Sequence, residues 1–298
     1  MGRYDFLKLD LINWDQNNGH GKGANYYGLA ASTAAGVNSK TPEGFNLEGL
    51  SMAPGSAMAA YIGLRAPIVP PANRTYALIV PVLNFATLAA GTGPPGSAVF
   101  GNPIELDLYG RGIRSLEGQG TNFLIVAGPP GDNFPPGLHK FQLYTWTGHP
   151  AEAPQMRAAD LAGLNPEGIV ELPPAPWTAD TQVQLLSDCG TKDWYGDGTQ
   201  AKHLTELAFK KFRSDWVTFG PVIQPPPVVT SIQYTSGGVV LEWRALKNLR
   251  YRVQYKATLS QPAWTDLPGD VLAAGPYALK ADASALGGQR FYQVIIAP

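Results

Sequence analysis

Two short segments share the pattern Asn-x-Glu-Gly, whose side chains are the ones in this chain best suited to bind a metal ion. FNLEGLSM spans Phe45–Met52, and LNPEGIVE spans Leu164–Glu171. Carboxylate and amide oxygens are the ligands of Ca²⁺, which takes roughly 6–8 oxygens in proteins. The glycine after each glutamate lets the backbone approach a neighbour closely or adopt a positive φ. The predicted Ca²⁺ ligands of the two copies are Glu48, Glu167, Asn46 and Asn165.

Three further charged residues occur in related positions. Asp188 ends a later apolar segment and could add a third carboxylate, while Arg65 in GLRAP and Arg114 in GIRSL share a register. An inward arginine either pairs with carboxylates or holds an anionic ligand in a bidentate manner. The alternative to a metal site is structural, with each glutamate hydrogen-bonded to neighbouring groups and joining adjacent repeats. Both interpretations predict that four residues lie close together: Glu48, Arg65, Arg114 and Glu167.

One histidine is a candidate for acid–base chemistry. His20 lies in the Gly-rich polar segment NNGHGKGANYYG, which we expect to be a flexible loop outside the core. Histidine is the side chain whose ordinary pKa suits proton transfer near neutral pH. The predicted catalytic residues are therefore His20, Glu48, Arg65 and Arg114.

The elements that position these residues form a weak internal repeat. A degenerate third copy, YGRGIRSLEG, spans Tyr109–Gly118, and each copy is followed by an apolar strand. Repeats of about 40–50 residues with several strands each are typical of a β-propeller, in which the first strand of every blade lines a central channel. The predicted second strands are Ala59–Pro67, Asn122–Pro130 and Val183–Gly190, and the predicted outer strands are Thr75–Phe85, Pro103–Gly110 and Leu138–Trp146.

A proline-rich segment, Phe219–Val229, predicts the boundary between an N-terminal domain at 1–222 and a C-terminal domain at 223–298. The C-terminal domain begins with two strands joined by a Ser-Gly-Gly turn, on the second of which Trp243 is a predicted core residue. The alternating strand RYRVQYKA follows, and QRFYQVIIAP closes the domain. Before the boundary, Gln200–Phe212 has the i, i+3, i+4, i+7 spacing of an amphipathic helix.

Composition restricts the class of protein. Charged residues make up 15% of the chain, and 34 glycines with 27 prolines favour many short strands joined by turns. A net charge of −1 argues against nucleic-acid binding. No apolar stretch is long enough to span a membrane, and no signal peptide is visible. The single cysteine excludes an internal disulfide. Composition therefore predicts an all-β fold.

The combined motifs resemble a bacterial propeller-like family of unassigned function in the group of esterase-like phytases. The resemblance covers residues 3–219 and rests on NLEGL…YIGLRAP, GIRSLE…FLIVAGPP, LNPEGI…VQLLSDCG and FRSDWVTF. Members of this family begin further upstream, so the resemblance implies an incomplete propeller and an exported, periplasmic or extracellular protein. The C-terminal domain resembles a fibronectin type III β-sandwich. The Glu-Gly turns are also similar to those of Ca²⁺-dependent gluconolactonases and paraoxonases, in which such a glutamate is a metal ligand.

These observations leave two classes of function open. They do not determine the oligomeric state. The first is a Ca²⁺-dependent hydrolase of lactones or esters, in which the metal polarises the carbonyl and a carboxylate or His20 activates water. The second is a non-catalytic exported binding or scaffold protein, with the sandwich as a spacer or attachment module. A phosphoesterase is a weaker alternative implied by the phytase resemblance.

Overall fold

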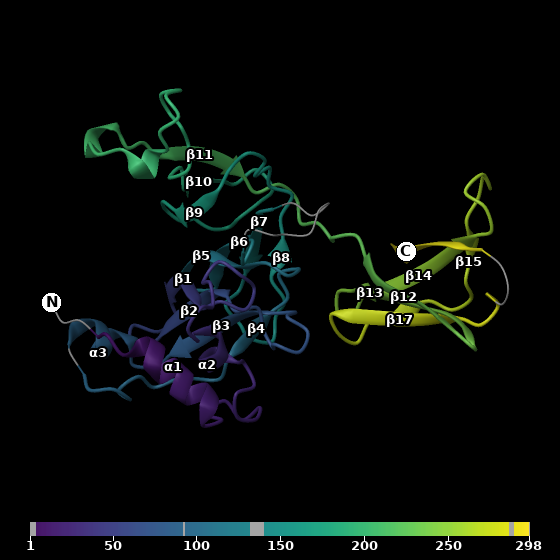
Figure 1. The fold of residues 1–298 in the computed structure, drawn as a ribbon, viewed down its shortest axis with the longest axis horizontal. Helices are drawn as coiled ribbons and strands as arrows, with labels where there is room; N and C mark the ends of the chain where they lie inside the picture. Colours follow the sequence, from purple (N-terminus) through teal and green to yellow (C-terminus); the bar gives the residue numbers. More distant parts are fainter. Residues whose placement is uncertain (1–3, 92, 132–139, 286–288, 298) are drawn as a thin grey trace. The chain divides into compact units, whose positions relative to one another are not determined.

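The computed structural model describes residues 4–91, 93–131, 140–285 and 289–297. The chain divides into two compact units, Met1–Ile223 and Gln224–Pro298, and the division falls inside the proline-rich segment. Both units are mostly β-structure in several antiparallel sheets (Figure 1). None of these sheets closes into a barrel over the described residues.

Unit 1 contains three sheets along the described part of the chain, and in each sheet the strands pair with their neighbours in sequence order. The first strands of successive sheets, β1, β5 and β9, lie next to one another. The first sheet consists of β1 (Asn46–Met52), β2 (Ala60–Ala66), β3 (Ala77–Val82) and β4 (Ile104–Leu106). The second consists of β5 (Gly112–Gln119), β6 (Asn122–Gly128), β7 (Gln142–Trp146) and β8 (Gln155–Met156). The third consists of β9 (Pro166–Ile169), β10 (Gln182–Ser187) and β11 (Arg213–Thr218).

The strands expected from the sequence repeat are present in these sheets. The first two residues of the predicted strand Leu138–Trp146 lie outside the described residues, and β7 forms its C-terminal part. The second strands of the sheets, β2, β6 and β10, each follow a copy of the repeat.

Glycines let the first and second sheets approach closely. A Cβ atom at Gly49 or Gly63 would lie 2.7 Å or 2.8 Å from Cγ2 of Ile113, so these two glycines form the flat surface on which Ile113 packs. A Cβ atom at Gly112 would overlap the carbonyl oxygen of Arg65. The first strand of the second sheet therefore rests directly on the backbone of the first sheet.

Helices cover the other face of the first sheet. Leu11, Trp14 and Tyr27 belong to one buried cluster with Leu64 and Leu78, which come from β2 and β3. The helices of unit 1 in the described ranges are α1 (Leu7–Gln16), α2 (Leu29–Ser32) and α3 (Phe85–Ala90).

The predicted helix at Gln200–Phe212 is wrong. The segment forms two short 3₁₀ turns, η1 (Ala201–His203) and η2 (Leu207–Phe209), separated by extended residues. Leu207 of the expected apolar stripe is 78% exposed, so this stripe gains no burial. Helices in proteins gain most of their stability from packing of such a stripe.

The third sheet packs on the second through apolar side chains. Leu124 and Val126 of β6 and Leu143 of β7 share a buried cluster with Leu185 of β10 and Val217 of β11. Residues on β10 alternate between buried and outward-facing positions, as expected for a sheet that is covered on one face.

Unit 2 has two sheets over the described residues and a core centred on aromatic side chains. Trp243 is fully buried, as predicted, and so is Tyr251; their rings meet edge to face at 6.0 Å. One sheet contains β12 (Val228–Thr235), β13 (Gly238–Arg244) and β17 (Tyr277–Asp282). The other contains β14 (Arg250–Lys256), β15 (Thr265–Asp266), β16 (Val271–Leu272) and β18 (Phe291–Ile296).

In the described part of the chain, no helix has the length and apolar character that crossing a membrane requires.

Candidate functional site

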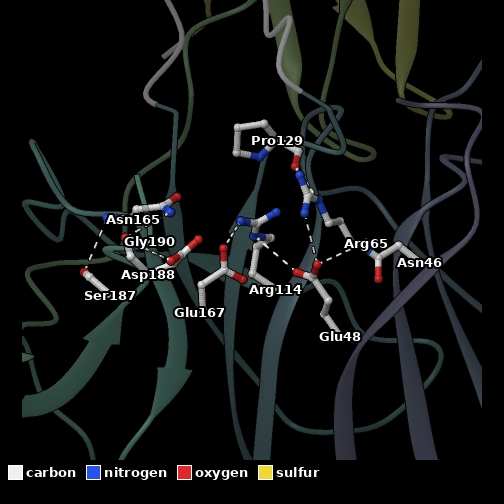
Figure 2. A network of polar contacts seen from close by, with 10 residues as sticks. All are labelled: Asn46, Glu48, Arg65, Arg114, Pro129, Asn165, Glu167, Ser187, Asp188 and Gly190. Carbon is white, nitrogen blue, oxygen red and sulfur yellow. Dashed lines mark hydrogen bonds and ion pairs between the residues drawn. The ribbon is translucent and has the colours of Figure 1, made fainter. Parts of the chain in front are cut away.

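The structure brings together the four residues that the sequence repeat predicts to be neighbours (Figure 2). Oε1 of Glu48 accepts a hydrogen bond from Nη1 of Arg65 at 3.1 Å, and Oε2 lies 3.3 Å from Nε of Arg114. Nη2 of Arg114 donates to Oε1 of Glu167. Arg114 therefore lies between the two glutamates and contacts both, and we call these four residues the Glu–Arg cluster.

Each sheet contributes to this cluster through an irregularity in its first strand. In β1 the pairing with β2 shifts between Leu47 and Gly49, which leaves Glu48 without an opposite residue. In β5 the shift lies between Ile113 and Ser115 and leaves out Arg114. A β-bulge of this kind bends the strand and re-aims the side chain of the extra residue.

The third sheet repeats the same device. In the pairing of β9 with β10, Gly168 lies opposite Leu186 and Pro166 lies opposite the next residue, Ser187. Glu167 therefore has no opposite residue. The three charged side chains at the bulges, Glu48, Arg114 and Glu167, thus come from equivalent positions in successive sheets. In the degenerate copy Tyr109–Gly118, Arg114 therefore corresponds in space to the glutamate of the other two copies.

Burial and charge set the protonation of the cluster. The side chains of Arg65 and Arg114 are 9% and 5% exposed, and that of Glu167 is 30% exposed. Burial raises the pKa of Glu167 to about 7, because loss of hydration outweighs the attraction of Arg114. Burial also lowers the pKa of Arg114, against the attraction of Glu167 and Glu48. Nη1 of Arg114 is buried without a hydrogen-bond acceptor.

Polar groups hold the Glu48–Arg65 end of the Glu–Arg cluster, and the residues near Glu167 bond instead to one another and to the backbone. The side-chain amide of Asn46 donates to Oε1 of Glu48 at 2.8 Å, and Nε of Arg65 donates to the carbonyl of Pro129 at 3.2 Å. At the other end, Asn165 and Asp188 bond mainly to backbone: Asp188 N–H donates to the Asn165 carbonyl at 2.9 Å. The Asp188 carboxylate accepts from Gly190 N–H at 2.7 Å.

The donor set fits Ca²⁺ poorly. The carboxylates of Glu48 and Glu167 face guanidinium groups, and Arg114 lies between them where a shared cation would have to sit. The amide nitrogen of Asn46 points to Glu48, and Asp188 is engaged by a backbone N–H. No group of three or more potential metal-binding His, Cys, Asp or Glu side chains is found among the described residues. The Ca²⁺ site stays a prediction that this geometry does not favour.

His20 has its contacts elsewhere in unit 1. Its Nε2 lies 3.0 Å from Oδ1 of Asp15, and its Nδ1 accepts the backbone N–H of Lys22 at 3.1 Å. Its ring also packs edge-on against Trp14 and Tyr27, each at 4.8 Å. The side chain has no exposed surface, which corrects the expectation of a flexible loop outside the core. A catalytic role for His20 stays a prediction, and both ring nitrogens are already engaged.

The Asp15 carboxylate ties this loop to the neighbouring helices, and no motif in the sequence marks it. Asp15 is fully buried, and its two oxygens accept the backbone N–H groups of Tyr27 and Leu29 at 2.9 Å and 2.8 Å. It thereby joins the end of α1 to the start of α2. A buried carboxylate that accepts several hydrogen bonds is a strong local constraint.

Similarity to a protein of known function would indicate a role for the Glu–Arg cluster. Comparisons with protein-family models, curated proteins and solved structures find no match. The function of the cluster therefore has to be inferred from its geometry.

Proposed function

We propose that unit 1 is an open, propeller-like arc and that the chain is a non-catalytic binding or scaffold protein. Successive meandering sheets whose first strands lie side by side support the propeller-like arrangement. The buried Trp243 and the two-sheet topology of unit 2 support a fibronectin-III-like sandwich, which would serve as a spacer or attachment module. Export, which the family resemblance implies, stays a prediction.

The observation that carries this proposal is the position of Arg114 between Glu48 and Glu167. Two carboxylates at one axis repel each other unless a positive charge separates them. Here the chain supplies that charge itself. Arg114 contacts the glutamates of the first and third sheets, and Arg65 pairs with Glu48 in its own sheet and donates to the carbonyl of Pro129, which follows β6 of the second sheet. The cluster then acts as a polar connection among the three sheets, in place of a catalytic metal centre.

Chelation tests the proposal. The melting temperature of the full chain should be the same with a Ca²⁺ chelator, with added Ca²⁺ and without either, because no resident ion contributes binding energy to the native state. Ester and lactone substrates should show no turnover above the buffer rate under any of these conditions. A fall in melting temperature on chelation that Ca²⁺ reverses would overturn the proposal and favour the Ca²⁺-dependent hydrolase.

A second candidate function is a metal-independent hydrolase of esters or lactones. The raised pKa of Glu167, together with its partial exposure, suits a general base that takes a proton from water near neutral pH. Arg114 would then stabilise the negative charge that develops on the carbonyl oxygen when that water attacks.

A pH profile and one matched pair of variants test this candidate. It requires an ester-hydrolysis rate that rises with an inflection near pH 7, as Glu167 loses its proton. Glu167→Gln should abolish that rate, and Glu171→Gln, at an exposed position nearby, should retain it. Equal rates in both variants would exclude Glu167 as the base.

A further inference from the structure

A second feature of unit 1 lies outside the Glu–Arg cluster. A pocket of about 570 Å³ opens beside β7, β8 and the segment that follows β8. This volume is in the range of sites for small organic molecules. Its apolar lining comes mainly from Phe141, Ala159, Leu161, Leu164 and Ile223.

Arg157 lies in the wall of this pocket and carries a charge without a counter-ion. The residue is 7% exposed, and in the part of the chain that the structure describes no carboxylate forms an ion pair with it. Its guanidinium donates one hydrogen bond, from Nη2 to the carbonyl of Thr178 at 3.1 Å, and lies 5.7 Å from the ring centre of Phe219. Nε is buried without an acceptor.

A buried arginine in this state is unusual, because such residues are normally paired with carboxylates. Arginine offers five N–H donors in a planar arrangement that matches the two oxygens of a carboxylate. At the two buried arginines of the Glu–Arg cluster, Arg65 and Arg114, a glutamate performs this role. At Arg157 no described residue supplies such an anion, which leaves guanidinium N–H groups available to a ligand.

The remaining charges of the pocket indicate the charge of the ligand. Lys140 and Asp160 also line it and have opposite charges, so the lining carries one net positive charge, that of Arg157. A monoanion with an apolar body matches both the charge and the apolar walls. We propose that this pocket binds a small organic carboxylate, whose oxygens pair with Arg157 and whose hydrocarbon part contacts Phe141, Leu161 and Leu164.

This inference deepens the proposed binding function and rests on it in one respect, namely that the chain holds its ligand without converting it. The pocket and the cluster share no residue, so variants separate the two ideas. A failure at the pocket leaves the cluster's structural role intact, and turnover of an ester would reject the binding function while leaving the pocket measurable.

Titration calorimetry of the full chain with hexanoate tests the proposal, with hexanamide as the neutral analogue and inorganic phosphate as the alternative anion. Hexanoate should bind, and the other two should bind at least about tenfold more weakly, since a hydrogen bond to a charged partner is involved. Arg157→Gln should weaken hexanoate binding by about tenfold or more. Arg213→Gln, which changes an exposed arginine paired with Asp215, is the matched control and should bind as the unmodified chain does.

Ala162→Trp tests the same pocket without altering the charge. Ala162 is exposed and lines the pocket, so an indole there should block the hexanoate site while the chain stays folded. Loss of binding in Ala162→Trp therefore supports the proposal even if Arg157→Gln does not fold. The proposal is overturned if hexanoate does not bind the unmodified chain, if hexanamide or phosphate binds as tightly, or if Ala162→Trp binds hexanoate unchanged.

Discussion

Glu48 and Arg114 occupy the same position in two successive sheets, and their side chains meet, with Nε 3.3 Å from Oε2. Each is the residue left unpaired by a β-bulge in the first strand of its sheet. Regular pairing would fix the side chains of these positions to the faces of the pleat, and the bulge releases them toward the neighbouring strand. The contact between sheets is thus encoded by one extra residue in each strand.

Replacing Glu48 by glutamine should lower the free energy of unfolding of unit 1 by about 2 kcal/mol, because Arg65 loses a charged hydrogen-bond acceptor and Arg114 loses an ion-pair partner. The measurement is chemical denaturation monitored by tryptophan fluorescence. Glu152→Gln, at an exposed position of the same unit, should change the free energy by less than about 0.5 kcal/mol. Equal effects of the two substitutions would show that the cluster contributes nothing specific to stability.

Replacing Gly49 by alanine should destabilise unit 1 by about 1–3 kcal/mol, because the new methyl group would lie 2.7 Å from Cγ2 of Ile113. The repeated glycine at 168 is the matched control. There the nearest atom to a new Cβ is Cβ of Leu186 at 3.8 Å, so Gly168→Ala should be tolerated. Thermal melts of both variants make the comparison, which fails if Gly168→Ala is the more damaging change.

The raised pKa of Glu167 predicts a pH dependence of stability. Between the ordinary glutamate value of 4.5 and about 7, the folded chain holds a proton that the unfolded chain has lost. Stability from this group is therefore present at low pH and falls as pH rises through that window. Glu167→Gln should flatten this part of the curve in denaturation experiments at a series of pH values. A variant with the same slope as the unmodified chain would contradict the assignment.

Residues 224–298 should fold when expressed alone. Their core, with Trp243 and Tyr251 fully buried, is formed within unit 2. The segment before it is fastened to unit 1, since Ile223 N–H donates to the carbonyl of Met156. Cooperative thermal unfolding, followed by near-ultraviolet circular dichroism, is the expected result, and a fragment without a transition would show that the core depends on unit 1.

The sequence repeat predicted much of the Glu–Arg cluster because it identified residues at equivalent positions in successive sheets. Side chains at equivalent positions of stacked sheets lie close together. The repeat grouped Arg114 with Arg65, whereas the structure places Arg114 at the bulge that is equivalent to Glu48 and Glu167. Bulges leave no reliable mark in composition, so the way in which these side chains reach one another was not predictable.

The apolar periodicity of the sequence did not identify the helices correctly. In α1 the buried face carries Asp10 and Asp15 beside Leu11 and Trp14, which hides the apolar period that normally identifies a helix. Both aspartates accept backbone N–H groups from distant segments, a tertiary effect that local sequence does not contain. The segment Gln200–Phe212 has a good helical pattern but no partner surface, and packing decided against it.

The alternation Glu–Arg–Glu across the three bulges bears on how such a chain can arise by gene duplication. Three faithful copies of one ancestral unit would place three like charges side by side, which is unfavourable in a buried site. The middle sheet carries a base at this position, and with Arg65 the charges of the Glu–Arg cluster balance. A duplicated unit can therefore stack in this way only if its copies differ at the bulge, and a designer who adds a further sheet beside the third would need a basic residue there.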